Sequence, residues 1–390
     1  MHPTQDGTSA TQRFATFAEE ARSTSPLYAH LSDALAADPT AAAIIDEAPL
    51  AQRRATLVFA AVHDLLLRGI EQGVLAAYYP SIGGERVPDD AATAAFVQVL
   101  AQHRDAIVDR LCTRSTQTNE PGRTVGQRAA LAWLQARTAP PGSAPDRRRL
   151  ALVEVGTSAG LLLHLDRYGY RSTVAAADTD DAVGAANSAE ARSGAPGGPS
   201  VEIVTRCLAE VPDLAIAPVA VRIGIDQAPL DVRDADDRAW LRACVWPEHV
   251  ARLERLDGAL AQAAAHDDVE IRTGDLLDLL EPVIATIHPD LQVVVLHSAT
   301  LAYLAPGQRA RFEATLDRIG ARRPLWRVGL EGHFLEPFAG LVAQQLGPPE
   351  PEQPGFVIAA TRWVDGRRED AALGRMQSHG GWLHFAPPTS

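Results

Sequence analysis

The sequence contains no lysine, so all 36 of its Lys+Arg residues are arginine. Without an ε-amine the chain cannot form a Schiff base with pyridoxal phosphate (PLP) or a carbonyl substrate. It also lacks the lysine of a Walker-type phosphate loop and of a Ser-Lys dyad. Anions must therefore be bound by guanidinium groups, backbone N–H groups or helix N-termini.

Cysteine is scarce as well. The chain has three cysteines, which are too few and too widely spaced for a disulfide framework or a CxxC metal site: Cys112, Cys207 and Cys244. Acidic and histidine residues show neither the calcium-loop pattern nor zinc spacing with these cysteines. We therefore expect a reduced, cytoplasmic protein without a metal site.

Long apolar segments and basic patches are also missing. No uncharged apolar run approaches the roughly 20 residues needed to cross a bilayer, and the first residues contain no apolar signal core. The formal net charge is −13 and the arginines are scattered, so the surface repels a phosphate backbone. We expect no membrane or nucleic-acid binding, and a small molecule as the partner; the oligomeric state is not predicted.

Length and composition are those of a globular protein. The chain has 390 residues, of which 46% are hydrophobic and 22% charged. This length favours one large domain with an appendage, or two domains. Apolar residues recur at helical spacing from about residue 11 to 138, so we predict an N-terminal all-α cap domain at 1–138 with five or six helices. A Pro-rich linker at 139–148 follows.

The remainder, 149–390, is predicted to be an α/β domain. Apolar runs of strand length alternate with helical stretches, which is typical of βαβ units and a mostly parallel sheet. The last strands have a turn at Asp365-Gly366 and indicate an antiparallel C-terminal edge. The predicted strands are 150–155, 173–177, 219–225, 291–296, 325–330, 356–364 and 381–385.

The most informative segment is residues 150–170. It reads as a buried strand that ends in Glu154, a turn from Gly156 to Gly160, and then a helix. The turn would lie at the carboxyl ends of parallel strands, where open α/β sheets bind ligands. Three interpretations of the turn compete.

The first interpretation is a cofactor or substrate loop, in which glycines let the backbone approach a ligand. The second is a Gly-x-Ser-x-Gly nucleophile elbow with Ser158 as the nucleophile. An acid and a histidine must follow it, and the candidates are Asp290 or Glu331 with His333 or His379. The third is close packing of a helix against the strand.

Further candidates follow other predicted strands. His297 ends an apolar run and would lie at the same sheet edge as Glu154, as a general base or as a capping histidine. Glu331 has the same placement after the next strand. Both are candidate catalytic residues together with Glu154 and Glu120.

The predicted cap domain supplies candidate substrate-binding residues. Gln117, Asn119 and Glu120 are polar loop residues that can bind a polar substrate, although Asn119 and Glu120 can instead cap a helix. Tyr78 and Tyr79 can line a pocket or simply pack. Arg53 can bind an anionic group or lie in solvent.

Eight segments together resemble the bacterial family DUF2332. They are SPLY (25–28), YYPS (78–81), QTNE (117–120), EVGTSAGLLLHLDRY (154–168), RIGID (222–226), WLRACVWPE (240–248), GD (274–275) and HSATLAYL (297–304). The resemblance implies the Rossmann-like fold of S-adenosylmethionine (SAM)-dependent methyltransferases, with the helical cap in front of it.

The methyltransferase pattern carries over in part. Glu154, Gly156 and Gly160 stand at the acid and two glycines of its first motif, and Ser158 replaces the middle glycine. Asp226, or alternatively Asp178, would contact the ribose, and Asp275 the adenine. The sequence His297-Ser298-Ala299-Thr300 replaces the usual acceptor turn. SAM is thus a possible cofactor, whereas PLP and a metal are not expected.

The function we expect is an enzyme of bacterial specialised metabolism that acts on a small polar metabolite. The default chemistry of the implied fold is SAM-dependent methyl transfer. The main alternative is SAM-independent intramolecular displacement or elimination, in which an amine closes a ring and expels an anion such as sulfate. A serine hydrolase and a small-molecule sensor without turnover are further alternatives.

Overall fold

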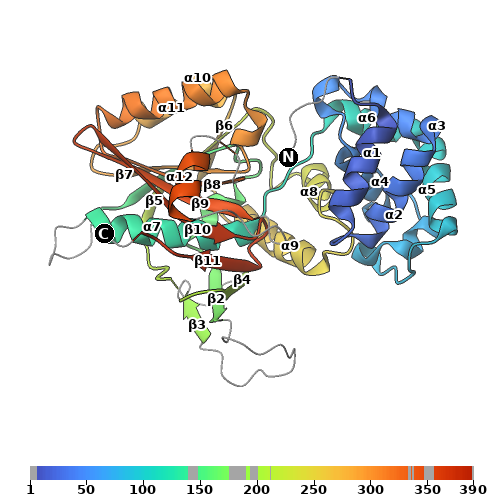
Figure 1. Ribbon diagram of the computed structural model, residues 1–390, viewed down its shortest axis with the longest axis horizontal. Coiled ribbons are helices and arrows are strands. Elements are labelled where there is room, and N and C mark those ends of the chain that lie inside the picture. Colours follow the sequence, from blue (N-terminus) through green and yellow to red (C-terminus); the bar gives the residue numbers. More distant parts are fainter. Residues whose placement is uncertain are drawn as a thin grey trace. The chain divides into compact units, whose positions relative to one another are not determined.

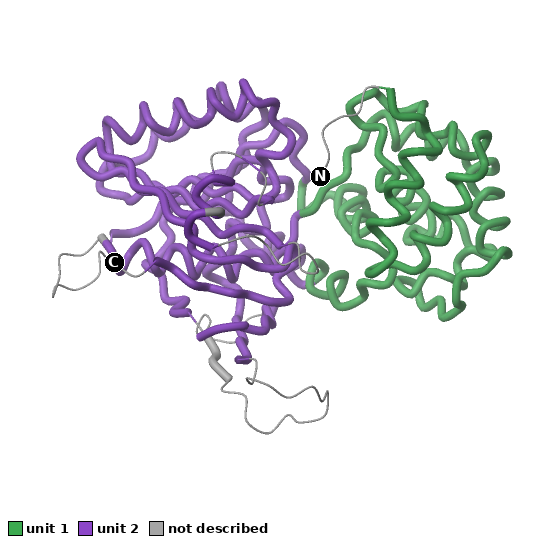
Figure 2. The backbone as a smooth tube through the Cα atoms, viewed as in Figure 1, with its two compact units in different colours: residues 1–118, 231–257 green, residues 119–230, 258–390 purple. Residues whose placement is uncertain are grey.

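The computed structural model describes residues 7–138, 148–174, 190–193, 201–210, 212–332, 335, 338–346 and 355–388. Two compact units make up the chain (Figure 2). Unit 1 comprises residues 1–118 and 231–257, and unit 2 comprises 119–230 and 258–390. Some sequence-based predictions fall outside the described residues. They are the roles of Asp178 and His333, most of the 139–148 linker and the end of the 173–177 strand.

Unit 1 is all helical. Its α-helices are α1 (Ala10–Ala21), α2 (Pro26–Ala37), α3 (Pro39–Ala42), α4 (Ala55–Leu67), α5 (Asp90–Gln102), α6 (Arg104–Thr113), α8 (Ala235–Ala243) and the first part of α9 (Val250–Ala264). Ser25 caps α2, which has Pro26 at its first position, and the Asp89 side chain caps α5. A side-chain oxygen before the first turn accepts a backbone N–H there, and proline is well tolerated at the first helical position.

Aromatic side chains fill the centre of unit 1. The Tyr28 and Phe59 rings stack with their centroids 4.4 Å apart, and Phe17 and Phe96 pack around Phe59. Trp246 joins the cluster with its ring 5.9 Å from that of Tyr28. Trp246 belongs to the stretch 231–257, so the helical unit is completed by residues that lie between two strands of unit 2 in sequence.

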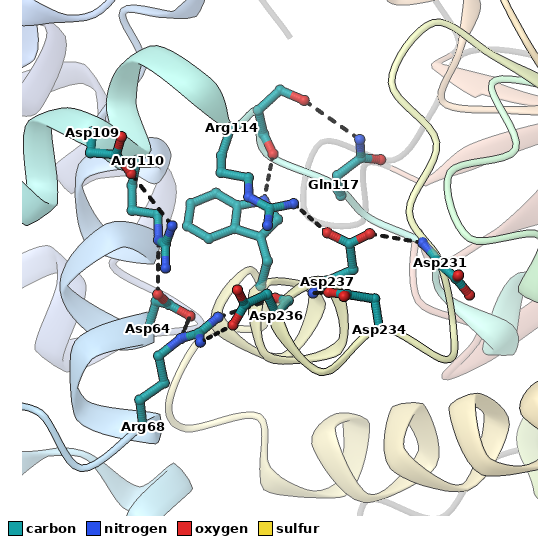
Figure 3. A network of polar contacts seen from close by, with 12 residues as sticks. Asp64, Arg68, Asp109, Arg110, Arg114, Gln117, Asp231, Asp234, Asp236 and Asp237 are labelled. Carbon is teal, nitrogen blue, oxygen red and sulfur yellow. Dashed lines mark hydrogen bonds and ion pairs between the residues drawn. The ribbon is translucent and has the colours of Figure 1, made fainter.

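A polar network fixes that inserted stretch to the rest of unit 1 (Figure 3). Asp64 on α4 is fully buried and accepts hydrogen bonds from Arg68 Nε at 2.7 Å and Arg110 Nε at 3.1 Å. Arg68 also pairs with Asp236 on α8, and Arg114 pairs with Asp237. Arg68 and Arg114 thus attach α8 to the ends of α4 and α6, whereas Arg110 joins α6 to α4. The two units accordingly divide the chain at other residues than the predicted 1–138 and 149–390.

Unit 2 is built on a mixed sheet. The strands are β1 (Leu150–Val155), β2 (Gly169–Val174), β3 (Glu190–Ser193), β4 (Glu202–Cys207), β5 (Val219–Asp226), β6 (Val269–Thr273), β7 (Gln292–Ser298), β8 (Leu325–Gly332), β9 (Phe356–Val364), β10 (Arg367–Met376) and β11 (Trp382–Phe385). Among the described residues their order is β3-β2-β4-β11-β10-β9-β8-β7-β1-β5-β6 (Figure 1).

The five strands β6-β5-β1-β7-β8 are mutually parallel, and β9, β10 and β11 follow as an antiparallel meander. The α/β class, the mostly parallel centre and the antiparallel pairing of the C-terminal strands are therefore confirmed. Their expected position at the edge of the sheet is wrong, because β4, β2 and β3 continue the sheet beyond β11. The strand β4 pairs in parallel with β11, so the segment between β1 and β5 extends the far end of the sheet.

Helices cover the two faces of the sheet differently. One face packs against α10 (Leu276–Ala285), α11 (Pro306–Gly320) and α12 (Phe338–Gln345), and its apolar cluster includes Val153 of β1 and Val295 of β7. The other face packs against α7 (Thr124–Thr138), where Gly126 lies against Ile358 and Met376. Because side chains alternate along a strand, Glu154 lies on the α7 face.

The expected helix after the β1 turn is wrong. Only a four-residue 3₁₀ turn, η6 (Leu161–His164), follows, and the chain then turns into β2. The buried Arg222 of β5 explains this difference, because it donates to the Leu163 carbonyl and pairs with both oxygens of Asp166 at 2.7 Å. If residues 161–166 formed an α-helix, the buried guanidinium group of Arg222 would lose these contacts.

Among the described helices of both units, none combines the length and apolar character needed to traverse a bilayer.

Candidate functional site

The turn that follows β1 lies where the strand order changes direction. Strand β1 pairs with β5 on one side and with β7 on the other, and the chain reaches β7 only after β6. Ligands of open α/β sheets bind at such switch points, beyond the carboxyl ends of the strands. Of the three described non-glycine residues with positive φ, Ser158 (54°) and Ala299 (54°) lie here, after β1 and after β7.

Glu154 is the central carboxyl group of this edge. Its side chain is 2% exposed and accepts a hydrogen bond from Thr157 Oγ1 at 2.7 Å. Burial raises the pKa of Glu154 to about 8, the Thr157 hydrogen bond and the charge of Arg123 oppose the rise, and Asp226 adds to it. A carboxyl group with this pKa exchanges its proton near neutral pH.

Two polar side chains hold the turn beside Glu154. Asp226, at the end of β5, accepts from the Ser158 N–H at 2.8 Å and from the Ala228 N–H at 2.9 Å. Asn119 donates its amide to the Thr157 carbonyl at 3.2 Å and accepts from the Leu161 N–H at 2.9 Å. The alternative in which Asn119 caps a helix is thus replaced by a direct contact with the turn.

Glu120 follows Asn119 in the chain and precedes the short 3₁₀ turn η5 (Pro121–Arg123). Glu120 caps this turn by accepting from the Gly122 N–H at 3.0 Å. Arg123 donates from Nε to the Ser378 carbonyl at 2.9 Å and from Nη1 to Ser298 Oγ at 3.4 Å, which places a guanidinium group beside the end of β7. Of these residues, Asn119 contacts the turn that holds Glu154, and Glu120 is its neighbour in the chain.

His297 and Glu331 lie on the opposite face of the sheet from Glu154. The register pairs His297 with Val155, and its ring lies against Phe312 of α11 and Phe338 of α12. His297 therefore lies at the same sheet edge as Glu154, as expected, but its side chain is on the other face. A shift of one residue in register sends a side chain to the other face.

Both ring nitrogens of His297 are occupied. Its Nδ1 lies 2.8 Å from Glu331 Oε1, and Arg327 Nε donates to its Nε2 at 3.0 Å. Burial lowers the pKa of His297, since the fully buried ring can be charged only at a high desolvation cost. The same Glu331 oxygen accepts from the Thr300 N–H at 3.0 Å, so the pair fixes the loop after β7.

The predicted cofactor residues lie along one row of strand ends. Asp275 caps α10 by accepting from the Leu277 N–H at 2.8 Å, and the Gly274 N–H donates to the Asp226 carbonyl at 2.9 Å. Gly156 has φ of +71°, and a Cβ there would overlap the Thr300 side chain. This glycine therefore makes room for a protein side chain rather than for a ligand.

Ser158 lacks the partner of a nucleophile elbow. Its Oγ is buried and has no hydrogen-bond partner among the described residues. Asp290 is exposed and pairs with His288, so it is not part of this site. The positive φ resembles that of an elbow, but no described imidazole is hydrogen-bonded to the serine.

The other predicted substrate-binding residues belong to unit 1. Tyr78 and Tyr79 are buried there; the Tyr78 hydroxyl donates to Asp89 at 2.6 Å and Tyr79 packs near His63. Arg53 pairs with Asp46 at 3.1 Å, and Gln117 donates to Ser115. Their contact with a substrate stays a prediction.

Sequence reasoning overlooked Thr157, Arg123 and Thr300. Each of them lies within three positions of a predicted site residue. Thr157 and Thr300 are polar residues in turns that follow strands, and Arg123 lies in the turn before α7. Among the described residues, no group of three or more His, Cys, Asp or Glu side chains has the arrangement of a metal site.

The comparisons with known proteins identify the family to which the chain belongs. No curated protein matches the chain. A family model described as "Uncharacterized protein conserved in bacteria" matches residues 11–385, nearly the whole length. The matched residues include every strand of the sheet and the whole row of strand ends around Glu154. The chain therefore belongs to the DUF2332 family.

Proposed function

We propose that unit 2 is an enzyme in which Glu154 transfers a proton to or from a small polar substrate at the carboxyl end of β1. The observation that carries the proposal is the buried Glu154 carboxyl, whose pKa is raised to about 8. General acid–base catalysis is most effective when the pKa of the catalytic group lies near the working pH.

A purely structural role does not account for Glu154. Burial of a carboxyl group at the end of an apolar strand costs free energy, and a single side-chain hydrogen bond from Thr157 compensates for part of it. A glutamine of the same shape would accept the same hydrogen bond without the penalty. Perturbed carboxyl groups at a ligand-binding sheet edge are candidates for function.

The reaction class that we favour is intramolecular displacement without a cofactor. Glu154 as carboxylate takes a proton from a substrate amine, the nitrogen forms a bond to a carbon of the same molecule, and that carbon loses an anionic group with its bonding electrons. The guanidinium of Arg123, which interacts electrostatically with Glu154, supplies positive charge for the anion. Asn119 and Thr157 hold the turn in place.

The residues of the β1 turn fit SAM poorly. Thr300 occupies the side of Gly156 on which a cofactor would approach, and its Oγ1 donates to the Val155 carbonyl at 3.1 Å. The 3₁₀ turn η6 replaces the helix whose N-terminus would face the polar end of the cofactor. Both Asp226 oxygens already accept backbone N–H groups. The reaction that we propose therefore does not use SAM.

SAM-dependent methyl transfer is the second candidate because of the strand order. The five parallel strands β6-β5-β1-β7-β8 follow the 3-2-1-4-5 order of nucleotide-binding sheets. Asp226 and Asp275 also stand next to the ends of β5 and β6, where ribose and adenine would lie. Calorimetric titration with SAM and S-adenosylhomocysteine decides between the candidates: we expect no binding heat, and saturable binding would favour methyl transfer.

The experiment that tests the function compares metabolites. A bacterial metabolite extract is incubated with the wild-type protein, with Glu154→Gln, or with Glu281→Gln as a surface control, without added SAM, and analysed by mass spectrometry. We expect the wild type and the control to deplete one metabolite and to form a product lighter by one acid molecule. Glu154→Gln should form none.

Each of the other possible results of this experiment would indicate a different function. A product heavier by one CH₂ group that requires added SAM indicates methyl transfer. A product that has gained water, together with loss of activity in Ser158→Ala, indicates a hydrolase. Depletion of a metabolite by binding alone, with the metabolite recovered intact after denaturation, indicates a sensor. Any of these results contradicts the proposal.

A further inference from the structure

Arg128 of α7 is a buried cation that has no carboxylate partner among the described residues. The residue is 7% exposed, and its Nε donates to the Leu214 carbonyl at 2.8 Å. Its Nη1 is buried as well and has no hydrogen-bond partner in the part of the chain that the structure describes. A guanidinium group that leaves water needs a counter-charge to offset the cost. The contacts of Arg128 therefore leave its charge uncompensated.

The guanidinium group of Arg128 lies over an aromatic ring, which fixes its plane. Its central carbon is 4.7 Å from the centroid of the Tyr170 ring on β2. The Tyr170 hydroxyl donates to the Leu165 carbonyl at 2.6 Å and lies 2.9 Å from Thr124 Oγ1, so the ring is held in place. A guanidinium group that stacks on a ring keeps the N–H groups at its edge for a planar contact with an oxyanion.

The acidic residues around this ring have other partners. Burial raises the pKa of Tyr170 and the charge of Asp166 adds to the rise, but Asp166 pairs through both oxygens with Arg222 at 2.7 Å. Asp213, which precedes the residue that Arg128 contacts, is exposed and accepts a backbone N–H of its own segment at 2.8 Å. Neither carboxylate neutralises Arg128, so a bound anion would supply the missing charge.

Two further buried side chains, on α7 and β4, have polar atoms without partners. Gln127 follows Thr124 by one turn of α7, and neither its Oε1 nor its Nε2 has a hydrogen-bond partner among the described residues. Thr205 of β4 lies on the same face of the sheet as Tyr170, because its strand partner Ser172 follows Tyr170 by two residues. The Thr205 Oγ1 is also buried and unpartnered. Buried polar atoms are rarely left in this state, and a polar ligand would satisfy them.

The segment that lies over Arg128 has no regular secondary structure. Residues 212–218 precede β5 and form neither a helix nor a strand. The segment is attached to α7 by the hydrogen bond from Arg128 to Leu214 and by Gln135, whose Oε1 accepts from the Ala217 N–H at 3.0 Å. It can shift without breaking a helix or a strand ladder. A ligand can therefore reach Arg128 through a small movement of this segment.

We propose that Arg128 binds a small oxyanion, the carboxylate or the phosphate group of a metabolite, on the side of α7 that contacts β2. The oxyanion accepts from Nη1 of the guanidinium group, and Gln127 and Thr205 provide further hydrogen-bond donors. Because the net charge of the chain is −13, its overall field does not attract anions, and binding depends on this local guanidinium group. The inference does not depend on the role of Glu154.

Isothermal titration calorimetry of the full-length protein tests this site with two probes, inorganic phosphate and acetate. Chloride is exchanged for the probe at constant ionic strength, so that screening by salt stays the same. We expect saturable binding of at least one probe to the wild type. Binding to Arg128→Met, which keeps the length of the side chain but not its charge, should be at least about tenfold weaker. Binding of phosphate alone identifies a phosphate site, and binding of acetate alone a carboxylate site.

Arg322→Gln is the matched control, because Arg322 is an exposed arginine of the same unit that pairs with Glu281. It should bind the probes as the wild type does. Thr205→Val removes one hydroxyl group and should weaken binding at least about threefold, which tests the site even if circular dichroism shows that Arg128→Met does not fold. The proposal is overturned if neither probe binds to the wild type. It is also overturned if folded Arg128→Met, or Thr205→Val in its place, binds as tightly as Arg322→Gln.

Discussion

Glu154 and His297 lie on neighbouring parallel strands, one residue apart in register, and their side chains lie on opposite faces of the sheet. Glu154 pairs with Leu296, whereas His297 pairs with Val155. Glu154 therefore contacts Thr157 of the turn on the α7 face, while His297 packs against Phe312 on the α11 face. The two side chains therefore lie in separate environments, and only Glu154 adjoins the strained turn at Ser158.

The first prediction concerns Glu154 and the pH dependence of stability. Its folded-state pKa, about 8, lies above the ordinary value of 4.5, so its ionisation destabilises the native state as the pH rises from about 4.5 to 8. Glu154→Gln should match the wild type at pH 4.5 and exceed its unfolding free energy by roughly 3 to 5 kcal/mol at pH 8.5. Urea unfolding at both pH values measures the difference.

Glu281→Gln is the matched control for this experiment. Glu281 lies on the surface, where hydrogen bonding to Arg318 lowers its pKa, so it is ionised throughout this pH range. The difference between Glu281→Gln and the wild type should not change between pH 5 and 8.5. A pH-independent difference for Glu154→Gln as well would mean that Glu154 ionises at an ordinary pH.

The second prediction concerns the loop after β7. Glu331 Oε1 accepts from His297 Nδ1 and from the backbone N–H groups of Thr300 and Leu301. Glu331→Gln removes the charge from three buried hydrogen bonds and should cost about 2 to 3 kcal/mol of unfolding free energy. Glu270→Gln, on the exposed side of β6, should stay within about 0.5 kcal/mol of the wild type. If Glu331→Gln and Glu270→Gln changed the unfolding free energy equally in denaturant titrations, the stabilising role of Glu331 would be contradicted.

The third prediction concerns backbone strain at the two strand ends. Ser158 and Ala299 both have φ of 54°, which glycine adopts without steric cost. Ser158→Gly and Ala299→Gly should each raise the unfolding free energy by up to about 1 kcal/mol. Ala302→Gly, in the 3₁₀ turn η7 (Leu301–Tyr303), should lower it by a similar amount. Destabilisation by all three changes would show that these turns are not strained.

The fourth prediction concerns the inserted helix of unit 1. Asp64 is fully buried between Arg68 and Arg110, so Asp64→Ala should cost about 3 to 5 kcal/mol because two guanidinium groups lose their counter-charge. Asp236→Ala, at an exposed site of the same network, should cost less than about 1 kcal/mol. Thermal unfolding of the two variants gives the comparison. Similar losses would mean that the buried pair does not hold α8.

The central strands were predictable because their apolar runs are continuous. The predicted ranges 150–155 and 356–364 coincide with β1 and β9, and the ends of β5, β7 and β8 differ by one or two residues. Strands buried on both faces need uninterrupted apolar residues, so their sequences are distinctive. The carboxyl group at the end of β1 was conspicuous for the same reason.

Contacts distant in sequence were not predictable from periodicity. The 3₁₀ turn after Gly160 depends on Arg222, which lies more than fifty residues later in the sequence. The helical unit includes Trp246, which lies between β5 and β6 in the sequence. Segment 161–168 has the apolar spacing of a helix, and tertiary contacts with a buried cation override that preference. The backbones of Gly122 and Gly380 lie in close contact although they are far apart in sequence, and no local pattern indicates this contact.

The face on which His297 lies was decided by the register of β7 against β1. The sequence places an apolar run before His297 but does not show whether Leu296 or His297 pairs with Glu154. A shift by one residue exchanges the two faces. Candidate residues at strand ends therefore need the register before roles are assigned to them.

The most direct test is a titration of the Glu154 carboxyl group itself. Infrared difference spectra or carbon NMR of protein labelled at the glutamate carboxyl carbon are recorded from pH 4 to 10 for the wild type and Glu154→Gln. We expect one carboxyl signal that titrates near pH 8 in the wild type and is missing in the variant. If every glutamate of the wild type titrates below about pH 6, Glu154 is an ordinary carboxylate and the proposed proton transfer at the end of β1 is contradicted.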